Sequence, residues 1–222
     1  MRLWPAWPTT TRTLYRLNNM GIPYRFDPLG TLGASPFPPG YHAVESVYFD
    51  KNTWFDTGVV VDTTNSFRCV VEFEYQSNYT SNIIGNEDNS LLFSERYGYA
   101  CRRAGSNMPS NLRIIAPKKR YTFESIYTTT GCQLFIKDDE GAVKSTTWNE
   151  SGSAGGVAAY LGARNGAERN PAACRLWSAE ILDASGETIA MILPCADAAG
   201  NLCFYDVLRK TFLTKLAGEL QP

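Results

Sequence analysis

Apolar and polar side chains alternate along the chain from residue 41 onwards, most regularly between residues 66 and 75. There, one face of an extended segment would carry Phe67, Cys69, Val71, Phe73 and Tyr75. The opposite face would carry Arg68, Glu72 and Glu74. A period of two with one apolar face is typical of a half-buried antiparallel strand, and this segment therefore predicts one.

Weaker alternation predicts six further strands, at residues 111–116, 121–128, 132–137, 158–162, 174–182 and 188–194. Turn-forming sequences separate several of them, namely Asp138-Asp139-Glu140-Gly141, Asn165-Gly166, Ala184-Ser185-Gly186 and Ala199-Gly200-Asn201. No window after residue 41 keeps a helical period for three turns. Many short strands joined by turns are typical of a β-sandwich or a barrel, so we expect one all-β domain over residues 41–222.

Residues 1–40 have a different composition. They hold most of the prolines of the chain: Pro5, Pro8, Pro23, Pro28, Pro36, Pro38 and Pro39. Proline fixes φ and lacks a backbone donor, so this density predicts an irregular, extended N-terminal arm rather than a sheet. One short helix is expected at residues 12–19, because Thr11 can cap its start and Gly21 can end it.

The arm is also rich in apolar side chains. The residues we expect to anchor it are Trp4, Trp7, Leu14, Tyr15, Leu17, Tyr24 and Phe26. An extended segment makes few hydrogen bonds of its own, so these anchors need a surface to lie on. That surface is either the β domain of the same chain or a partner protein, and the sequence favours neither.

Charge and composition exclude several classes of function. The formal net charge is −1 and no basic face is concentrated in the sequence, which argues against nucleic-acid binding. No apolar run approaches the roughly 18 residues of a membrane span. The first residues lack a secretory apolar stretch, so we expect synthesis and folding in the cytoplasm, with release inside a virus particle as one route out of the cell.

Six cysteines are scattered without a C-x-x-C pair, and His42 is the single histidine. These numbers argue against a zinc site, and we expect neither a metal nor a cofactor. Several of the cysteines replace apolar residues in the predicted strands. We therefore expect reduced, buried thiols rather than a disulfide framework.

Catalytic constellations are not apparent. Glu72 and Glu74 would share a strand face, but Phe73 and Gln76 stand where a glycosidase would need further carboxyl groups. The acids of Asp138-Asp139-Glu140 are expected at a hairpin tip rather than around a metal. A nucleophilic triad would have to be built on His42, and Gly152, Gly155 and Gly156 lack the strand-to-helix setting of a phosphate loop. We expect no enzymatic activity.

Several motifs resemble those of a known family. Trp54-Phe55-Asp56-Thr57-Gly58 precedes the first alternating strand, and Tyr160-Leu161-Gly162-Ala163-Arg164 comes later. The closing run comprises Arg175–Ile181, Ile192-Leu193-Pro194-Cys195, Phe204-Tyr205-Asp206-Val207 and Phe212-Leu213. In order and spacing they resemble laminin-G-like or concanavalin A-like domains, which are common in structural proteins of bacteriophages and prophages and in gut bacteria. The resemblance covers roughly residues 43–220.

The resemblance implies an antiparallel β-sandwich of the concanavalin A-like jelly-roll type. Its motif residues read as scaffold: Asp56-Thr57-Gly58 and Tyr205-Asp206 as turn formers, and Pro194 as a residue at a strand end. Fold alone does not fix function.

For function, the resemblance implies a virion accessory protein of a tailed phage, whose arm docks to capsid or tail proteins and whose sandwich binds host glycans. One alternative is a free lectin-like module, with Trp148, Asn149, Tyr97 and Tyr99 as the glycan-binding candidates, although the sequence favours a packed strand residue at each of these positions. Another is a purely architectural protein, for which a homotrimer would suit a fibre and a monomer a decoration.

Overall fold

The computed structural model describes residues 35–72, 80–94, 98–103, 106–109, 119–149, 156–165 and 173–222, and every regular element in these ranges is a β-strand. An eleven-stranded sheet contains β1 (Tyr41–Ala43), β2 (Val47–Phe49), β4 (Ser66–Glu72), β9 (Arg120–Thr128), β10 (Gly131–Asp138), β11 (Val143–Trp148), β13 (Cys174–Leu182), β14 (Thr188–Asp197), β15 (Leu202–Asp206), β16 (Thr211–Phe212) and β18 (Leu220–Gln221). A seven-stranded sheet contains β3 (Trp54–Val61), β5 (Thr80–Gly85), β6 (Ser90–Ser94), β7 (Gly98–Arg103), β8 (Ser106–Pro109), β12 (Val157–Leu161) and β17 (Thr214–Ala217).

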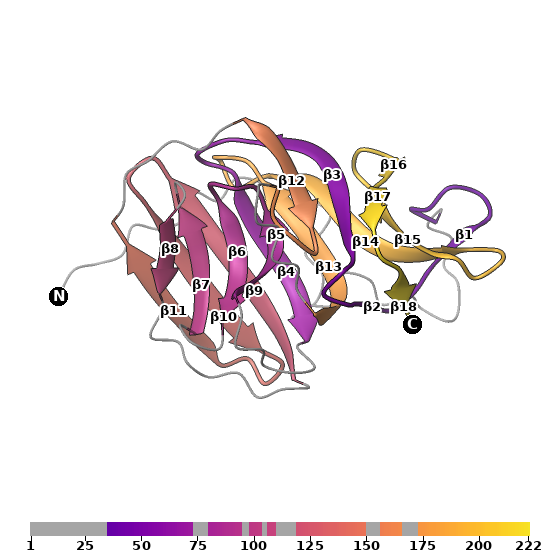
Figure 1. Cartoon of the computed structure of the whole chain (residues 1–222), viewed down its shortest axis with the longest axis horizontal. Coiled ribbons are helices and arrows are strands. Elements are labelled where there is room, and N and C mark those ends of the chain that lie inside the picture. Colours follow the sequence, from indigo (N-terminus) through magenta and orange to yellow (C-terminus); the bar gives the residue numbers. More distant parts are fainter. Residues whose placement is uncertain are drawn as a thin grey trace. The chain divides into compact units, whose positions relative to one another are not determined.

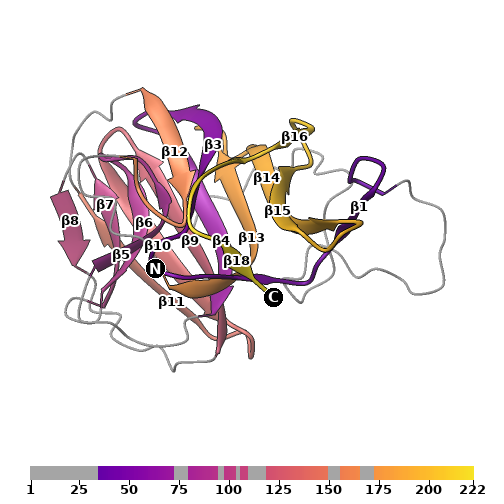
Figure 2. The same cartoon turned by 45° about the vertical axis from the view of Figure 1, so that its right-hand side comes forward.

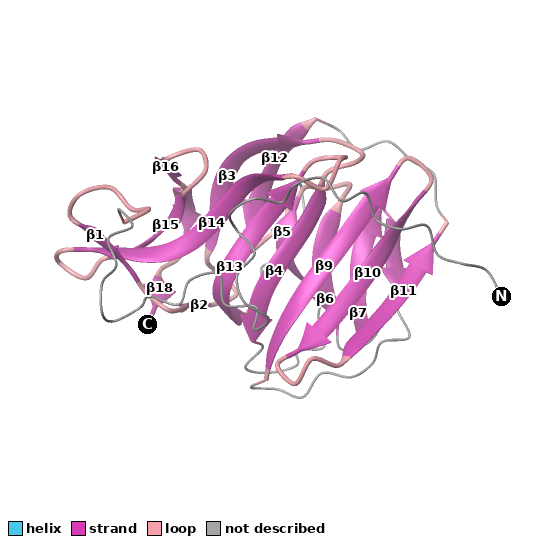
Figure 3. Ribbon diagram, turned by 180° about the vertical axis from the view of Figure 1, so that it is seen from behind, coloured by secondary structure: helices cyan, strands magenta, loops and turns pink. Residues whose placement is uncertain are grey.

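The two sheets pack face to face as an antiparallel β-sandwich (Figure 1). Seen from behind in Figure 3, β4, β9, β10 and β11 form the near layer, with β5, β6 and β7 behind them. The large sheet runs β11-β10-β9-β4-β13-β14-β15-β16, while β2 lies between β13 and β18. The expected all-β sandwich is confirmed.

Both sheets contribute to one core. Phe67, Phe123 and Leu134 of the large sheet are completely buried in the same cluster as Ile84 and Leu161 of the small sheet. The alternation predicted for β4 is confirmed as far as the described residues go, because the predicted apolar face is buried and Arg68 lies on the other face at 28% exposure.

The predicted strands at 121–128, 132–137, 158–162, 174–182 and 188–194 correspond to β9, β10, β12, β13 and β14. The segments 73–75 and 111–116 lie outside the described residues. Four of the predicted buried cysteines, Cys69, Cys132, Cys174 and Cys195, are buried free thiols, while Cys203 is half-buried. The side chain of Cys101 is not among those described.

Three hairpins of the large sheet use the same five-residue turn, Asp-x-x-Gly-x, beginning at Asp138, Asp183 and Asp197. In each, the aspartate Oδ1 accepts backbone N–H bonds from the third and fifth turn residues. The fourth residue is a glycine with φ between +80° and +88°, a conformation that glycine adopts without a steric penalty. The predicted turns at these places are confirmed, including the hairpin tip at Asp138-Asp139-Glu140.

The family-like motifs also act as scaffold. Asp56 Oδ1 accepts the N–H of Gly58 at 2.7 Å, and Gly58 has φ +64°. Asp206 Oδ1 accepts the N–H groups of Leu208 and Arg209 at the turn after β15. Asp56-Thr57-Gly58 lies inside β3 rather than in a turn between strands. Arg209 connects this segment to the turn after β15, because its Nη1 donates to the Thr57 carbonyl at 2.8 Å and lies 3.7 Å from Asp206 Oδ2.

The expectation that Pro194 ends a strand is wrong, because β14 continues to Asp197. Pro194 stands between Ile192, the last β14 residue that pairs toward β13, and Cys195, which pairs with β1. Its carbonyl accepts the N–H of Val44 at 3.3 Å. The missing donor is therefore tolerated where β14 changes partner rather than where it ends.

The predicted arm lies mostly outside the described residues, including the expected helix at 12–19 and all seven anchor residues. Its last residues are described. Phe37 is buried, with its ring centroid 5.9 Å from that of Tyr205 in β15. The chain from residue 35 onwards thus packs on the large sheet before β1 begins.

Candidate functional site

Strand register places four polar side chains in one row across the large sheet. Arg175 of β13 is directly opposite Glu72 of β4 on one side and Tyr48 of β2 on the other. Tyr48 is in turn opposite Gln221 of β18. Directly opposed residues in antiparallel strands project from the same face with Cβ atoms about 4.5–5.5 Å apart. The row therefore lies on one face of the sheet.

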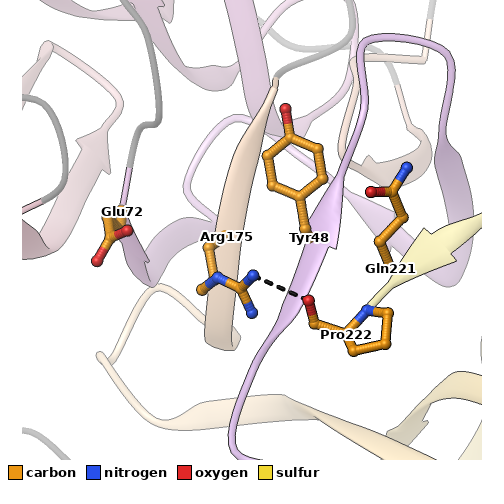
Figure 4. A pocket seen from close by; sticks show the side chains of 5 residues that line it. All are labelled: Tyr48, Glu72, Arg175, Gln221 and Pro222. Atoms are coloured by element: carbon orange, nitrogen blue, oxygen red, sulfur yellow. Dashed lines mark hydrogen bonds between the residues drawn. The ribbon is translucent and has the colours of Figure 1, made fainter.

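These four residues and Pro222 line a small pocket of about 110 Å³ (Figure 4). The Arg175 guanidinium is fixed from two sides: Nη2 donates to the Pro222 carbonyl at 2.9 Å and Nη1 to Ser46 Oγ at 3.2 Å. Within the described residues, the Glu72 carboxylate and the Gln221 amide have no hydrogen-bond partner. Both groups are thus available to a ligand.

The lining combines a carboxylate acceptor, an amide that donates and accepts, a guanidinium donor and a tyrosine ring. Such a mixture matches the hydroxyl groups and the apolar C–H face of a sugar. Typical drug-sized pockets measure about 300–1,000 Å³, so this pocket can take only part of a ligand that extends over the surface. Glu72 is the one carboxylate among the described lining residues, whereas glycoside hydrolysis uses two.

The polar row continues beyond Glu72. Arg120 of β9 is directly opposite Glu72, and its guanidinium carbon lies 5.3 Å from the centroid of the Trp177 ring. Trp177 occupies a bulge of β13, where the pairing with β4 shifts between Leu176 and Ser178. The Arg120 guanidinium therefore covers one face of the Trp177 indole, and neither residue lines the pocket.

The structure places only some of the predicted glycan-binding residues. Trp148 ends β11 opposite Cys132 and packs, half-buried, against the core, and Asn149 is exposed beside it. Tyr99 is in β7 opposite Phe93, with its side chain not among those described, and Tyr97 lies outside the described residues. The pocket brings together none of them.

The remaining chemical candidates are also apart from one another. His42 is exposed on β1 opposite Ala196. The three acids at the β10–β11 hairpin surround Lys119 Nζ, which lies 3.2–3.3 Å from a carboxylate oxygen of each. Across the described ranges, no group of three or more histidine, cysteine, aspartate or glutamate side chains is arranged to hold a metal, and no helix there is long and apolar enough to cross a membrane.

No protein-family model matches the chain, and no curated protein sequence matches it. Among solved structures, a "putative carbohydrate binding protein" from Bacteroides ovatus superposes with a TM-score of 0.52 at 12% identity, over 81% of this chain and 60% of that one. The enzymatically active domain of tailspike protein 2 of bacteriophage CBA120 gives a TM-score of 0.46 at 10% identity, over 70% of this chain and 30% of that one. The chain thus spans less than two thirds of either protein. The first likeness shows a shared β-rich fold, and the second is too distant to show one.

Proposed function

We propose that this chain is a non-enzymatic β-sandwich module that binds carbohydrate at the pocket between β4, β13, β2 and β18. The observation that carries the proposal is the row of Glu72, Arg175, Tyr48 and Gln221, in which a fixed guanidinium stands between a carboxylate and an aromatic ring. The fold shared with a protein described as carbohydrate-binding supports it.

A sugar suits this row better than a charged ligand. Glu72 would repel an anion, and Arg175 would repel a cation, whereas a neutral hydroxyl can donate to the first and accept from the second. Tyr48 and Gln221 extend the row outward by two strands (Figure 4). A sugar chain that lies along the row would therefore meet polar groups repeated at the strand spacing of about 4.8 Å.

The test is a glycan-array screen followed by calorimetric titration of the strongest glycan. Gln221→Ala should weaken that glycan about tenfold, since one hydrogen bond to a ligand contributes about 1–1.5 kcal/mol. Gln133→Ala is the matched control, because Gln133 is an exposed glutamine of the same sheet that does not line the pocket. Equal affinity in both variants, or an array without hits, would refute the proposed site.

At a finer level, we propose that the module is a virion accessory protein of a tailed phage. The support is the resemblance of its motifs to those of phage structural proteins, together with an arm rich in proline and aromatic anchors. Other virion proteins, of the capsid or the tail, would then be the partners of the arm, and the sandwich would face host glycans. Extended arms suit such docking, because they cover a large surface although ordering them costs entropy.

This finer proposal has its own test. A variant without residues 1–34 keeps Phe37, which packs on the sheet, and should fold with the circular dichroism of β structure. It should be absent from purified particles that contain the full chain. Complete incorporation of the truncated protein would refute the anchoring role, while glycan binding by a chain that never enters particles would favour the free lectin-like module.

A further inference from the structure

Two cysteines of the large sheet face each other across a hairpin. Cys195 of β14 is directly opposite Cys203 of β15, and their Sγ atoms lie 2.9 Å apart. Directly opposed residues in antiparallel strands have Cα atoms about 4.5–5.5 Å apart, which lies inside the range of disulfide-bonded cysteines. The backbone therefore already holds the two thiols at a separation that a covalent bond can close.

The two thiols differ in environment. Cys195 is buried, whereas Cys203 is half-buried and can meet a small reagent. The hydrogen bond from Cys195 lowers the pKa of the Cys203 thiol, and the same hydrogen bond, together with burial, raises the pKa of Cys195. Cys203 is thus the more accessible and the more readily ionised of the pair, as an attacking thiolate should be.

We propose that Cys195 and Cys203 form a reversible cross-strand disulfide when the protein meets a small-molecule disulfide oxidant. The Cys203 thiolate attacks one sulfur of the oxidant, which forms a mixed disulfide and releases one thiol. Cys195 then attacks Cys203 Sγ, and its proton leaves with the second released thiol. In total, two protein thiols are oxidised to one disulfide and one oxidant disulfide is reduced to two thiols.

The bond would fasten a specific part of the fold. The two strands continue past the main sandwich with β1, as Figure 2 shows, and Ala43 of β1 pairs with Cys195. A disulfide here would join the two strands of the hairpin whose turn begins at Asp197. This hairpin lies beside the sheet face on which Phe37 packs. Oxidation should therefore make this end of the sheet harder to open, without touching the pocket.

Other cysteines serve as internal controls. Burial raises the pKa of Cys174 to about 12 and also raises the pKa of Cys69 well above its ordinary value. Both thiols are completely enclosed and should not react in the folded protein.

The test is to incubate the reduced full chain with oxidised glutathione and to count thiols after denaturation. The count should fall from six to four. Trypsin should release both cysteines in the single peptide Leu176–Arg209, because no lysine or arginine lies between its ends, and this peptide should lose the mass of two hydrogen atoms. Cleavage before Asp197 should then give two cysteine-bearing fragments that separate only after reduction.

Two variants sharpen the result. Cys203→Ser should keep all five of its thiols, whereas Cys174→Ser should fall from five to three, since it retains the pair. An unchanged count in the wild type, a disulfide mapped to any other pair, or glutathione retained on Cys203 without ring closure would each overturn the proposal. The wild-type peptide map decides between these outcomes even if a variant fails to fold.

Discussion

Gly162 of the small-sheet side lies against Phe49 of the large sheet, at a point where no side chain fits. It follows β12, has φ +82°, and donates its N–H to the Ile83 carbonyl at 2.7 Å. A Cβ at this position would lie 2.7 Å from the Thr53 carbonyl oxygen and 2.8 Å from two ring carbons of Phe49. Gly162→Ala should therefore destabilise the fold by two separate mechanisms.

The two costs can be separated with a second glycine. The left-handed backbone costs an L-residue about 1–2 kcal/mol, and forcing extra atoms into a packed core costs about 1–3 kcal/mol more. Gly200 has a similar φ, +86°, but no atom within 4 Å of its virtual Cβ. Gly162→Ala should thus lose about 2–5 kcal/mol of unfolding free energy, whereas Gly200→Ala should lose only the backbone cost of about 1–2 kcal/mol.

The assay is urea unfolding of both variants, monitored by circular dichroism. The slope of unfolding free energy against urea concentration is determined for each variant. We expect a lower midpoint for Gly162→Ala than for Gly200→Ala at an unchanged slope. Equal midpoints would show that the close approach to Thr53 and Phe49 contributes nothing, and the scaffold interpretation of the Tyr160–Arg164 motif would lose its physical basis.

Two further predictions concern the core and the turns. Phe204→Ala should lose about 3–5 kcal/mol in the same urea assay, because the ring is fully buried, stacked on Phe49 at 5.3 Å and edge-on to Phe55 at 5.2 Å; a loss below about 1 kcal/mol would contradict this packing. Hydrogen bonds from the Ser185 hydroxyl and from turn N–H groups lower the pKa of Asp183. The contribution of Asp183 to the free energy of unfolding is therefore complete above the ordinary carboxyl pKa, and it is lost as the pH falls through the lowered pKa of the folded protein. Asp183→Asn should therefore reduce the loss of unfolding free energy between about pH 5 and pH 2. If urea unfolding at several pH values shows the same loss in the variant and the wild type, Asp183 does not contribute in this way.

Alternation in the sequence is sufficient to predict the central strands, because residues such as Phe67 and Phe123 must face a core shared by both sheets. It is not sufficient at the edges. β11, at residues 143–148, is exposed over most of its length, and its sequence carries no apolar face. Short strands such as β1 and β18 hold too few residues for a period to appear. The prediction for Pro194 is wrong because a strand that changes partner can accept a proline in its interior, and the sequence does not reveal such a change.

The candidate site is beyond the reach of sequence patterns for a related reason. Within its own strand Glu72 stands out only as half of an acidic pair, but its partners in the pocket come from β13, β2 and β18, which are remote in sequence. The register of two strand pairs puts Arg175 between Glu72 and Tyr48, and the register of a third puts Gln221 opposite Tyr48. A shift of one residue in any of these pairs would send a side chain of the row to the core face. A bulge at Trp177 changes the β13–β4 register two residues after Arg175, which pairs with Glu72. Bulges of this kind re-aim side chains, so the candidate row depends on the irregularity in β13 as well as on the strand register.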